Sequence, residues 1–147
     1  MRTWLLLLAL SAATTVLLAV APSAGGAAGA SATLTVRNSP YGRVVWDGQN
    51  RAVYAFTRDP RGRTACYGAC ATAWPPYIVR GSLRAGTGVK RSLLGTTRRR
   101  DGSRQLTYAG KPLYYYAHDP VGQVLCQNVA EFGGLWLVVR ASGDLVR

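Results

Sequence analysis

The sequence predicts an all-β protein: a single small domain of two meander-like repeats that pack as a sandwich or in a barrel-like way. The first reason is a duplication. Residues 54–62 return as residues 114–122, and both copies read aromatic, any residue, aromatic, two more residues, then Asp-Pro-x-Gly. The second reason is that short apolar runs, separated by turn residues, surround each copy, as in β-meanders. We place the two repeats at about residues 41–79 and 102–140.

Each copy of the duplicated stretch predicts a strand followed by a tight turn. Aromatic residues two apart on a strand project from the same face, and Asp-Pro-x-Gly favours a type I turn. The repeat-motif residues are Tyr54, Phe56, Asp59, Tyr114, Tyr116 and Asp119. We expect the rings to pack in a core and the aspartates to hold the turns. The alternative is a ligand cleft lined by these tyrosines and aspartates.

The other elements follow from local composition. In the first half we expect strands at 31–40, 43–47, 51–57 and 77–79, with one short helical turn near Cys66–Trp74 that the following prolines end. A basic, glycine-containing linker, residues 80–101, holds a short strand near 92–97. In the second half, strands are expected at 104–108, 112–117 and 135–139, with a final edge at 145–147.

The first 30 residues have the pattern of a signal peptide. Arg2 supplies a positive charge, residues 4–20 form an apolar run, and small-residue cleavage sites follow. The run is slightly short for a membrane span, and no second apolar stretch approaches that length. We therefore expect a secreted, extracytoplasmic domain, residues 31–147, without a transmembrane segment after cleavage. Because the first cysteine is Cys66, the chain is not expected to be a signal-Cys lipoprotein.

The chain is strongly basic, with 18 Lys and Arg against 6 Asp and Glu. Arginine, which supplies sixteen of those positive charges, binds phosphate or carboxylate groups through a planar fork of donors. For an exported protein this predicts attraction to anionic cell-envelope polymers or lipid headgroups, and not to nucleic acid. Arg98, Arg99 and Arg100 are the candidate anion-binding residues, and a solvated mobile loop is the alternative.

With these features in view, the chain resembles a bacterial family of secreted repeat proteins with a Tyr-x4-Asp motif, whose members are often described as lipoproteins. The matching residues are Tyr54, Asp59, Cys66, Cys70, Trp74, Pro75, Pro76, Asp101, Gly102, Gln105, Tyr108, Gly110, Pro112, Leu113, Tyr114, Asp119, Gly134 and Trp136. The resemblance implies an exported, envelope-associated domain of unestablished function. The chain departs from the family pattern in lacking a lipid-attachment cysteine and in carrying Cys126.

Three cysteines in an exported chain cannot all pair within it. We favour a disulfide between Cys66 and Cys70, the pair that matches the family's Cys-x3-Cys. A bridge from either one to Cys126 would close a longer loop, worth about 4 kcal/mol against about 2 kcal/mol. The geometry of the fold, and not loop length, therefore decides between these pairings.

The sequence predicts no catalytic residue and no cofactor, and an enzyme is the less favoured interpretation. The favoured function is a non-enzymatic binding or structural module that contacts anionic envelope components. The alternative is a redox or metal-handling extracytoplasmic protein. It would use Cys66 and Cys70 with Cys126 and His118, which are only weak candidates for metal ligands because their spacing is loose.

Overall fold

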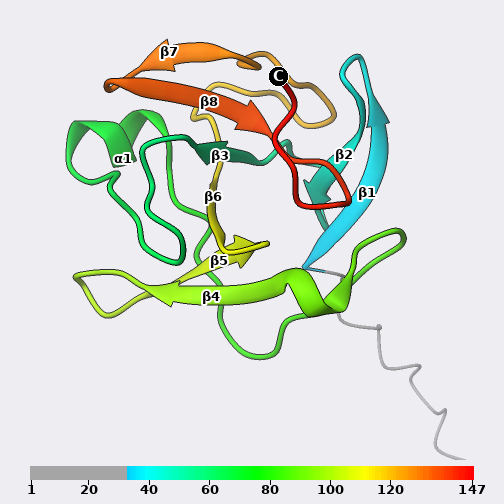
Figure 1. Ribbon diagram of the computed structural model, residues 1–147, viewed down its shortest axis with the longest axis horizontal. Coiled ribbons are helices and arrows are strands. Elements are labelled where there is room, and N and C mark those ends of the chain that lie inside the picture. The colour runs from blue at the N-terminus through cyan, green and yellow to red at the C-terminus, as the bar shows by residue number, and fades with distance from the viewer. Residues whose placement is uncertain (1–32) are drawn as a thin grey trace, which may run out of the picture.

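The computed structural model describes residues 33–147, and nearly all of its elements are strands (Figure 1). In chain order they are β1 (Leu34–Ser39), β2 (Gly42–Asp47), β3 (Tyr54–Phe56), α1 (Ala69–Ala73), the 3-10 turn η1 (Arg91–Leu93), β4 (Leu94–Arg98), β5 (Arg104–Tyr108), β6 (Lys111–Tyr114), β7 (Val129–Glu131) and β8 (Gly134–Val138). The predicted all-β class is confirmed, with α1 as its short helical turn. The expected signal peptide, residues 1–30, lies outside the described residues.

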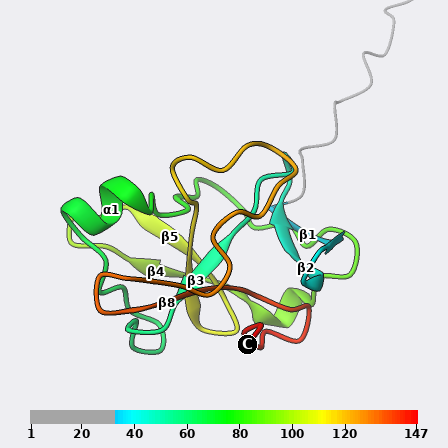
Figure 2. The same cartoon turned by 90° about the horizontal axis from the view of Figure 1, so that it is seen from above.

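The strands form two antiparallel sheets that do not close into a barrel. One sheet is the β1–β2 hairpin, and the other has six strands in the order β4-β5-β6-β3-β8-β7. Its centre is the antiparallel pair β3–β6, in which Tyr54 lies opposite Tyr114. The duplicated strands therefore meet in the middle of this sheet, while α1 and the β1–β2 hairpin lie at opposite ends of the molecule (Figure 2). Within residues 33–147, no helix has the length and apolar character needed to cross a bilayer.

Two reciprocal backbone hydrogen bonds join the copies, in an arrangement that is approximately twofold symmetric. The amide of Gly62 donates to the carbonyl of Gly110 at 2.7 Å, and the amide of Gly122 donates to the carbonyl of Asn50 at 2.7 Å. Each residue of the second bond is offset by sixty from its counterpart in the first. Each Asp-Pro-x-Gly turn thus docks on the hairpin turn of the other copy, which predicts that neither copy forms its structure independently.

Side-chain alternation divides the interior between two hydrophobic clusters. Tyr54 and Phe56 of β3 join one cluster, whereas Ala55 between them joins the other. The first cluster also gathers the other rings that the sequence placed in the core: Trp46, Trp74, Tyr114, Tyr116 and Trp136. The second cluster is mainly aliphatic. The central strands therefore carry aromatic residues on one face and aliphatic residues on the opposite face.

Three segments differ from the elements expected locally. Residues 77–79 make only isolated bridges, because the preceding Pro75 and Pro76 lack the amide donors of a regular ladder. The chain end is likewise limited to a bridge between Val139 and Leu145. The short edge strand β7 was not predicted, since its residues carry no alternating apolar pattern. The predicted strand within residues 80–101 is present as β4, preceded by η1.

Candidate functional site

The two Tyr-x4-Asp motifs bond to each other across the repeats. The Tyr54 hydroxyl donates to Asp119 Oδ2 at 2.5 Å, and the Tyr114 hydroxyl donates to Asp59 Oδ2 at 2.7 Å. Because β3 and β6 are antiparallel neighbours, each strand directs its tyrosine toward the turn that follows the other strand. Each motif is thus completed by its counterpart in the second copy.

Each aspartate also orders the loop that follows it. Asp59 Oδ1 accepts from the amide of Ala65 at 2.7 Å, and Asp119 Oδ1 accepts from the amide of Leu125 at 3.3 Å. One carboxylate oxygen therefore holds its own loop while the second holds the tyrosine of the other copy. An aspartate suits this position because a carboxylate accepts several hydrogen bonds and donates none.

A stack of four aromatic rings runs beside these bonds. Phe56 stacks on Trp136 with ring centroids 4.2 Å apart, Trp136 on Trp74 at 4.0 Å, and Trp74 meets Tyr116 at 4.9 Å. Phe56 and Tyr116 are equivalent residues of the two copies. The stack therefore joins rings from both copies, as the hydrogen bonds join their polar groups. The Trp74 indole donates to Glu131 Oε2 at 2.8 Å at its polar edge. This arrangement is a well-packed core, and a small cavity of about 190 Å³ lies beside Phe56 and Asp59, with the hairpin turn at Ala109 and Gly110 on its other side.

Burial raises the pKa of both aspartates and both tyrosines of these exchanged hydrogen bonds. It raises the pKa of Asp59 to about 6, although its hydrogen bonds to Ala65 and Tyr114 and the nearby charge of Arg99 oppose the shift. Burial also raises the pKa of Asp119, and it raises the pKa of Tyr54 and Tyr114 above the ordinary tyrosine value. The tyrosines therefore remain protonated donors at neutral pH.

We expect stability to fall as pH rises from about 4 to about 6.5. In that range the folded protein still binds a proton at Asp59 that the unfolded chain has released, so the free energy of unfolding decreases with pH. The contribution is fully present below the unfolded pKa of 3.8 and is lost as pH passes about 6. Denaturant unfolding at several pH values should show a shallower decrease for Asp59→Asn. Equal slopes for the variant and the unmodified protein would contradict this assignment.

The predicted disulfide between Cys66 and Cys70 is confirmed, and the two Cα atoms lie 5.3 Å apart. Cys126, which occupies the position of Cys66 in the second copy, is free and partly buried. Burial raises the pKa of its thiol, which disfavours the reactive thiolate. His118 packs edge-on against the ring of Tyr116. Among residues 33–147, no group of three or more His, Cys, Asp or Glu side chains is placed to hold a metal ion.

The three consecutive arginines have different environments. Arg99 is buried and donates to Gln105 Oε1 at 2.7 Å and to the carbonyl of Cys66 at 2.9 Å. Arg98 and Arg100 are exposed, and Arg100 lies over the ring of Tyr67. Arg99 thus fastens the chain after β4 to the disulfide loop, and its two neighbours face solvent.

Gln105 and Asp101, two of the residues that match the family pattern, both make structural hydrogen bonds. Gln105 is fully buried and, besides accepting from Arg99, donates to the carbonyl of Leu113 at 2.8 Å. Asp101 Oδ1 accepts from both the amide and the hydroxyl of Ser103, which closes the turn between β4 and β5. Gln105 therefore holds the strands beside the repeat centre, whereas Asp101 shapes an exposed turn at the edge of the sheet. The sequence analysis assigned neither role, because the pairing of β4, β5 and β6 brings Gln105 to its partners Arg99 and Leu113.

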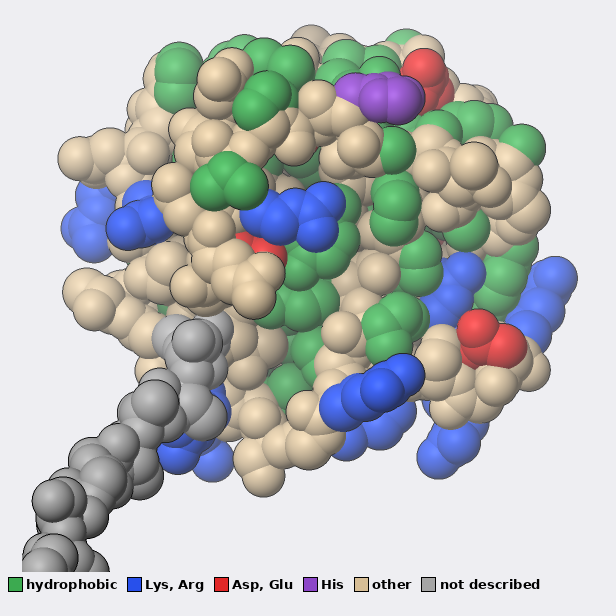
Figure 3. Space-filling view, turned by 180° about the vertical axis from the view of Figure 1, so that it is seen from behind, with side chains coloured by type: hydrophobic (Ala, Val, Ile, Leu, Met, Phe, Trp, Pro, Cys, Tyr) green, Lys and Arg blue, Asp and Glu red, His purple; other side chains and the backbone are tan. Residues whose placement is uncertain are grey.

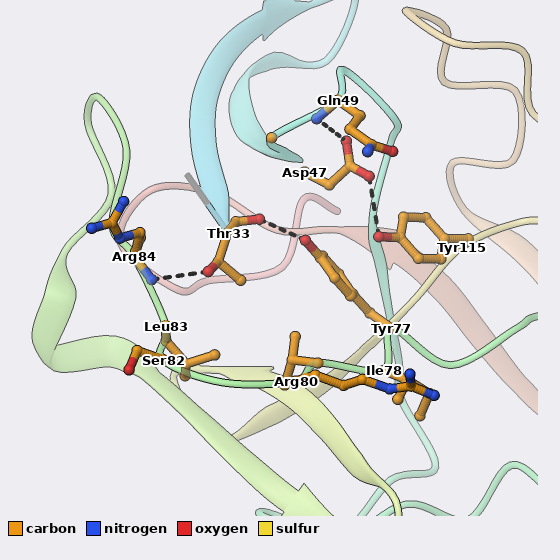
Figure 4. Close-up of a pocket in the computed structure, with 12 residues that line it drawn as sticks. Thr33, Asp47, Gln49, Tyr77, Ile78, Arg80, Ser82, Leu83, Arg84 and Tyr115 are labelled. Carbon is orange, nitrogen blue, oxygen red and sulfur yellow. Dashed lines mark hydrogen bonds between the residues drawn. The ribbon is translucent and has the colours of Figure 1, made fainter. Parts of the chain in front are cut away.

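A surface cavity of about 610 Å³ lies away from the repeat motif (Figure 4). The hairpin turn after β2 and the extended segment 77–80 form two sides, residues 82–84 form a third, and Tyr115 contributes from the second repeat. The carboxylate of Asp47 is buried beside it and accepts from the Tyr115 hydroxyl at 3.1 Å. Sequence reasoning did not find this cavity, because its walls come from segments that are far apart in the chain.

Comparison with known proteins identifies the repeat. A family model described as a secreted repeat of unknown function matches residues 35–77 and 95–140. The chain belongs to this family. In this secreted repeat protein one family match contains β3 and the other contains β6, so each match supplies one tyrosine and one aspartate of the exchanged bonds. No curated protein and no solved structure was found to match the chain.

Proposed function

We propose that this secreted repeat protein is a non-enzymatic binding or structural module that contacts anionic polymers of the cell envelope through its arginine-rich surface. In this proposal a signal peptide, residues 1–30, is cleaved on export and no lipid is attached at a signal-adjacent cysteine. Cys66, the first cysteine of the chain, forms a disulfide with Cys70, which supports that view.

The observation that supports the proposal most strongly is which groups bond to the acidic side chains. All six accept hydrogen bonds from uncharged groups: tyrosine or serine hydroxyls, the Trp74 indole, or backbone amides. They are Asp47, Asp59, Asp101, Asp119, Glu131 and Asp144. Within residues 33–147 the carboxylates are thus engaged by uncharged donors, and the whole chain carries three basic side chains for each acidic one. Figure 3 shows Lys and Arg side chains distributed around a hydrophobic strip on one face, with few acidic groups among them.

Excess positive charge on a folded surface concentrates polyanions and speeds their encounter, and the effect weakens as salt rises. Arg98 and Arg100 are exposed cations on a strand end and the adjoining turn, and Arg100 lies over the aromatic ring of Tyr67. An arginine supplies paired donors for a carboxylate or phosphate. These two residues are thus the best-placed members of the predicted arginine site.

We expect the protein to be retained on immobilised polygalacturonate and released by added salt. Replacing Arg98 and Arg100 by Gln should lower the salt concentration that releases it. The control Arg63→Gln with Arg147→Gln removes the same charge from exposed positions elsewhere and should change release less. Arg99 is left unchanged because its guanidinium is buried. A protein that passes the polymer unretained at low salt would overturn the proposal, and equal effects of the two double variants would remove Arg98 and Arg100 from it.

The alternative hypothesis is a redox or metal-handling protein. Its support is that Cys126 is a free thiol packed against the same hydrophobic cluster to which Cys66 and Cys70 belong. The raised thiol pKa of Cys126 argues against exchange at neutral pH. Mass mapping should find one free thiol, at Cys126. Rapid reversible reduction of the Cys66–Cys70 bond at a physiological potential, or a tightly bound metal, would favour the alternative.

A further inference from the structure

The duplication gives the molecule two equivalent hairpin turns, one after β2 and one after β5. The turn after β5 is packed against a neighbouring turn, whereas the turn after β2 borders a cavity. In the second copy, the hairpin turn after β5 packs closely against the turn at residues 141–143. A Cβ added to Gly143 would lie only 2.4 Å from the Cβ of Ala109, and the Tyr108 hydroxyl donates to the carbonyl of Ala141 at 2.8 Å. In the first copy, the corresponding hairpin turn borders the 610 Å³ cavity.

The floor of this cavity consists of aromatic side chains that hydrogen bonds hold in place (Figure 4). The rings of Tyr77 and Tyr115 lie 4.9 Å apart at an angle of 37°. The Tyr77 hydroxyl donates to the carbonyl of Thr33 at 2.7 Å, and Tyr115 is held by Asp47. Asp47 is itself fixed, because its other oxygen accepts from the amides of Gln49 and Arg51 at 2.8 and 2.7 Å. The site is therefore organised before any ligand enters.

The rim of the cavity is positively charged. Arg80 is exposed, lines the cavity, and makes no hydrogen bond or ion pair with any other residue of the described range 33–147. Arg84 also borders the cavity, where its backbone amide donates to the Thr33 hydroxyl, and the exposed residues Gln49 and Ser82 add uncharged polar groups. The one carboxylate of the lining, that of Asp47, is buried and engaged. The exposed charge that a ligand meets is that of the arginines.

We propose that this cavity binds an acidic sugar unit of an anionic glycan, an inference that rests on the proposed polyanion binding and specifies its ligand. The apolar face of a pyranose ring packs on Tyr77, since Arg51 already lies over the ring of Tyr115, and the sugar carboxylate pairs with Arg80. Sugar hydroxyls reach the Gln49 and Ser82 side chains. The volume lies within the range of small-ligand sites and accommodates a short oligosaccharide segment.

Calorimetric titration with trigalacturonate tests the site directly, with neutral galactotriose as the comparison ligand. We expect saturable binding of the acidic trisaccharide and about tenfold weaker binding by Arg80→Gln, because one charge-assisted contact is lost. Arg63→Gln removes the same charge from an exposed position outside the cavity lining and should bind as the unmodified protein does. Both side chains are exposed, so the fold is retained in both variants.

The outcomes separate this inference from the general proposal. Retention on polygalacturonate without binding of trigalacturonate would overturn the cavity site while leaving polyanion contact standing. Equal binding of galactotriose, or unchanged binding by Arg80→Gln, would overturn the acidic-sugar assignment. Short polyphosphate is the third ligand. If polyphosphate binds, Arg80→Gln weakens its binding, and trigalacturonate does not bind, the site recognises phosphate and the sugar assignment is wrong.

Discussion

Replacing Trp136 by Ala is expected to lower the free energy of unfolding by about 3–5 kcal/mol. Trp136 is fully buried between Trp74 and Phe56 in the ring stack and meets the edge of Tyr114 at 5.1 Å. It therefore contacts rings of both copies at once. Its indole nitrogen has no hydrogen-bond partner within the described chain, so the loss comes from packing alone.

Denaturant unfolding followed by circular dichroism measures this effect without depending on tryptophan fluorescence. The matched control is Phe132→Ala, since Phe132 is a large ring with 41% of its surface exposed. We expect that control to change the free energy of unfolding by less than about 0.5 kcal/mol. Similar values for the two variants would show that the ring stack does not hold the repeats together.

Tyr54→Phe is expected to destabilise the protein by about 1.5–3 kcal/mol, because Asp119 loses a hydrogen bond made to a charged acceptor in a partly buried place. Tyr114→Phe should have a similar effect through Asp59. The control is Tyr41→Phe, since Tyr41 is an exposed tyrosine whose hydroxyl makes no hydrogen bond within residues 33–147. Both effects are read as shifts of the unfolding midpoint at pH 7. Losses no larger than that of the control would contradict the role given to the hydroxyls.

Much of the fold could be predicted because its signals are local. The spacing of Tyr54 and Phe56 fixed a shared strand face, and the two prolines after Trp74 fixed the end of α1. The pairing of Cys66 with Cys70 also involves neighbours in the chain. The exchange between Tyr54 and Asp119 could not be predicted in this way. Both copies carry the same residues, so a bond within a copy and a bond between copies look identical in the sequence.

The arginine run shows how a usable signal was missed. Arg98, Arg99 and Arg100 form one basic run in the sequence, yet in the structure they alternate exposed, buried, exposed. This is the period of a strand, and β4 ends at Arg98. Applying that alternation would have separated Arg99 from its neighbours. No comparable signal exists for the cavity at Tyr77 and Tyr115, because folding alone brings its walls together.

Each Tyr-x4-Asp motif is completed by the other copy. Double-mutant cycles test it most directly, with Tyr→Phe and Asp→Asn changes and urea unfolding as the measurement. Tyr54 with Asp119, and Tyr114 with Asp59, should show coupling energies of about 1–3 kcal/mol, and the same-copy pairs should be additive within about 0.5 kcal/mol. Coupling that is stronger within a copy than between copies would contradict the exchanged architecture.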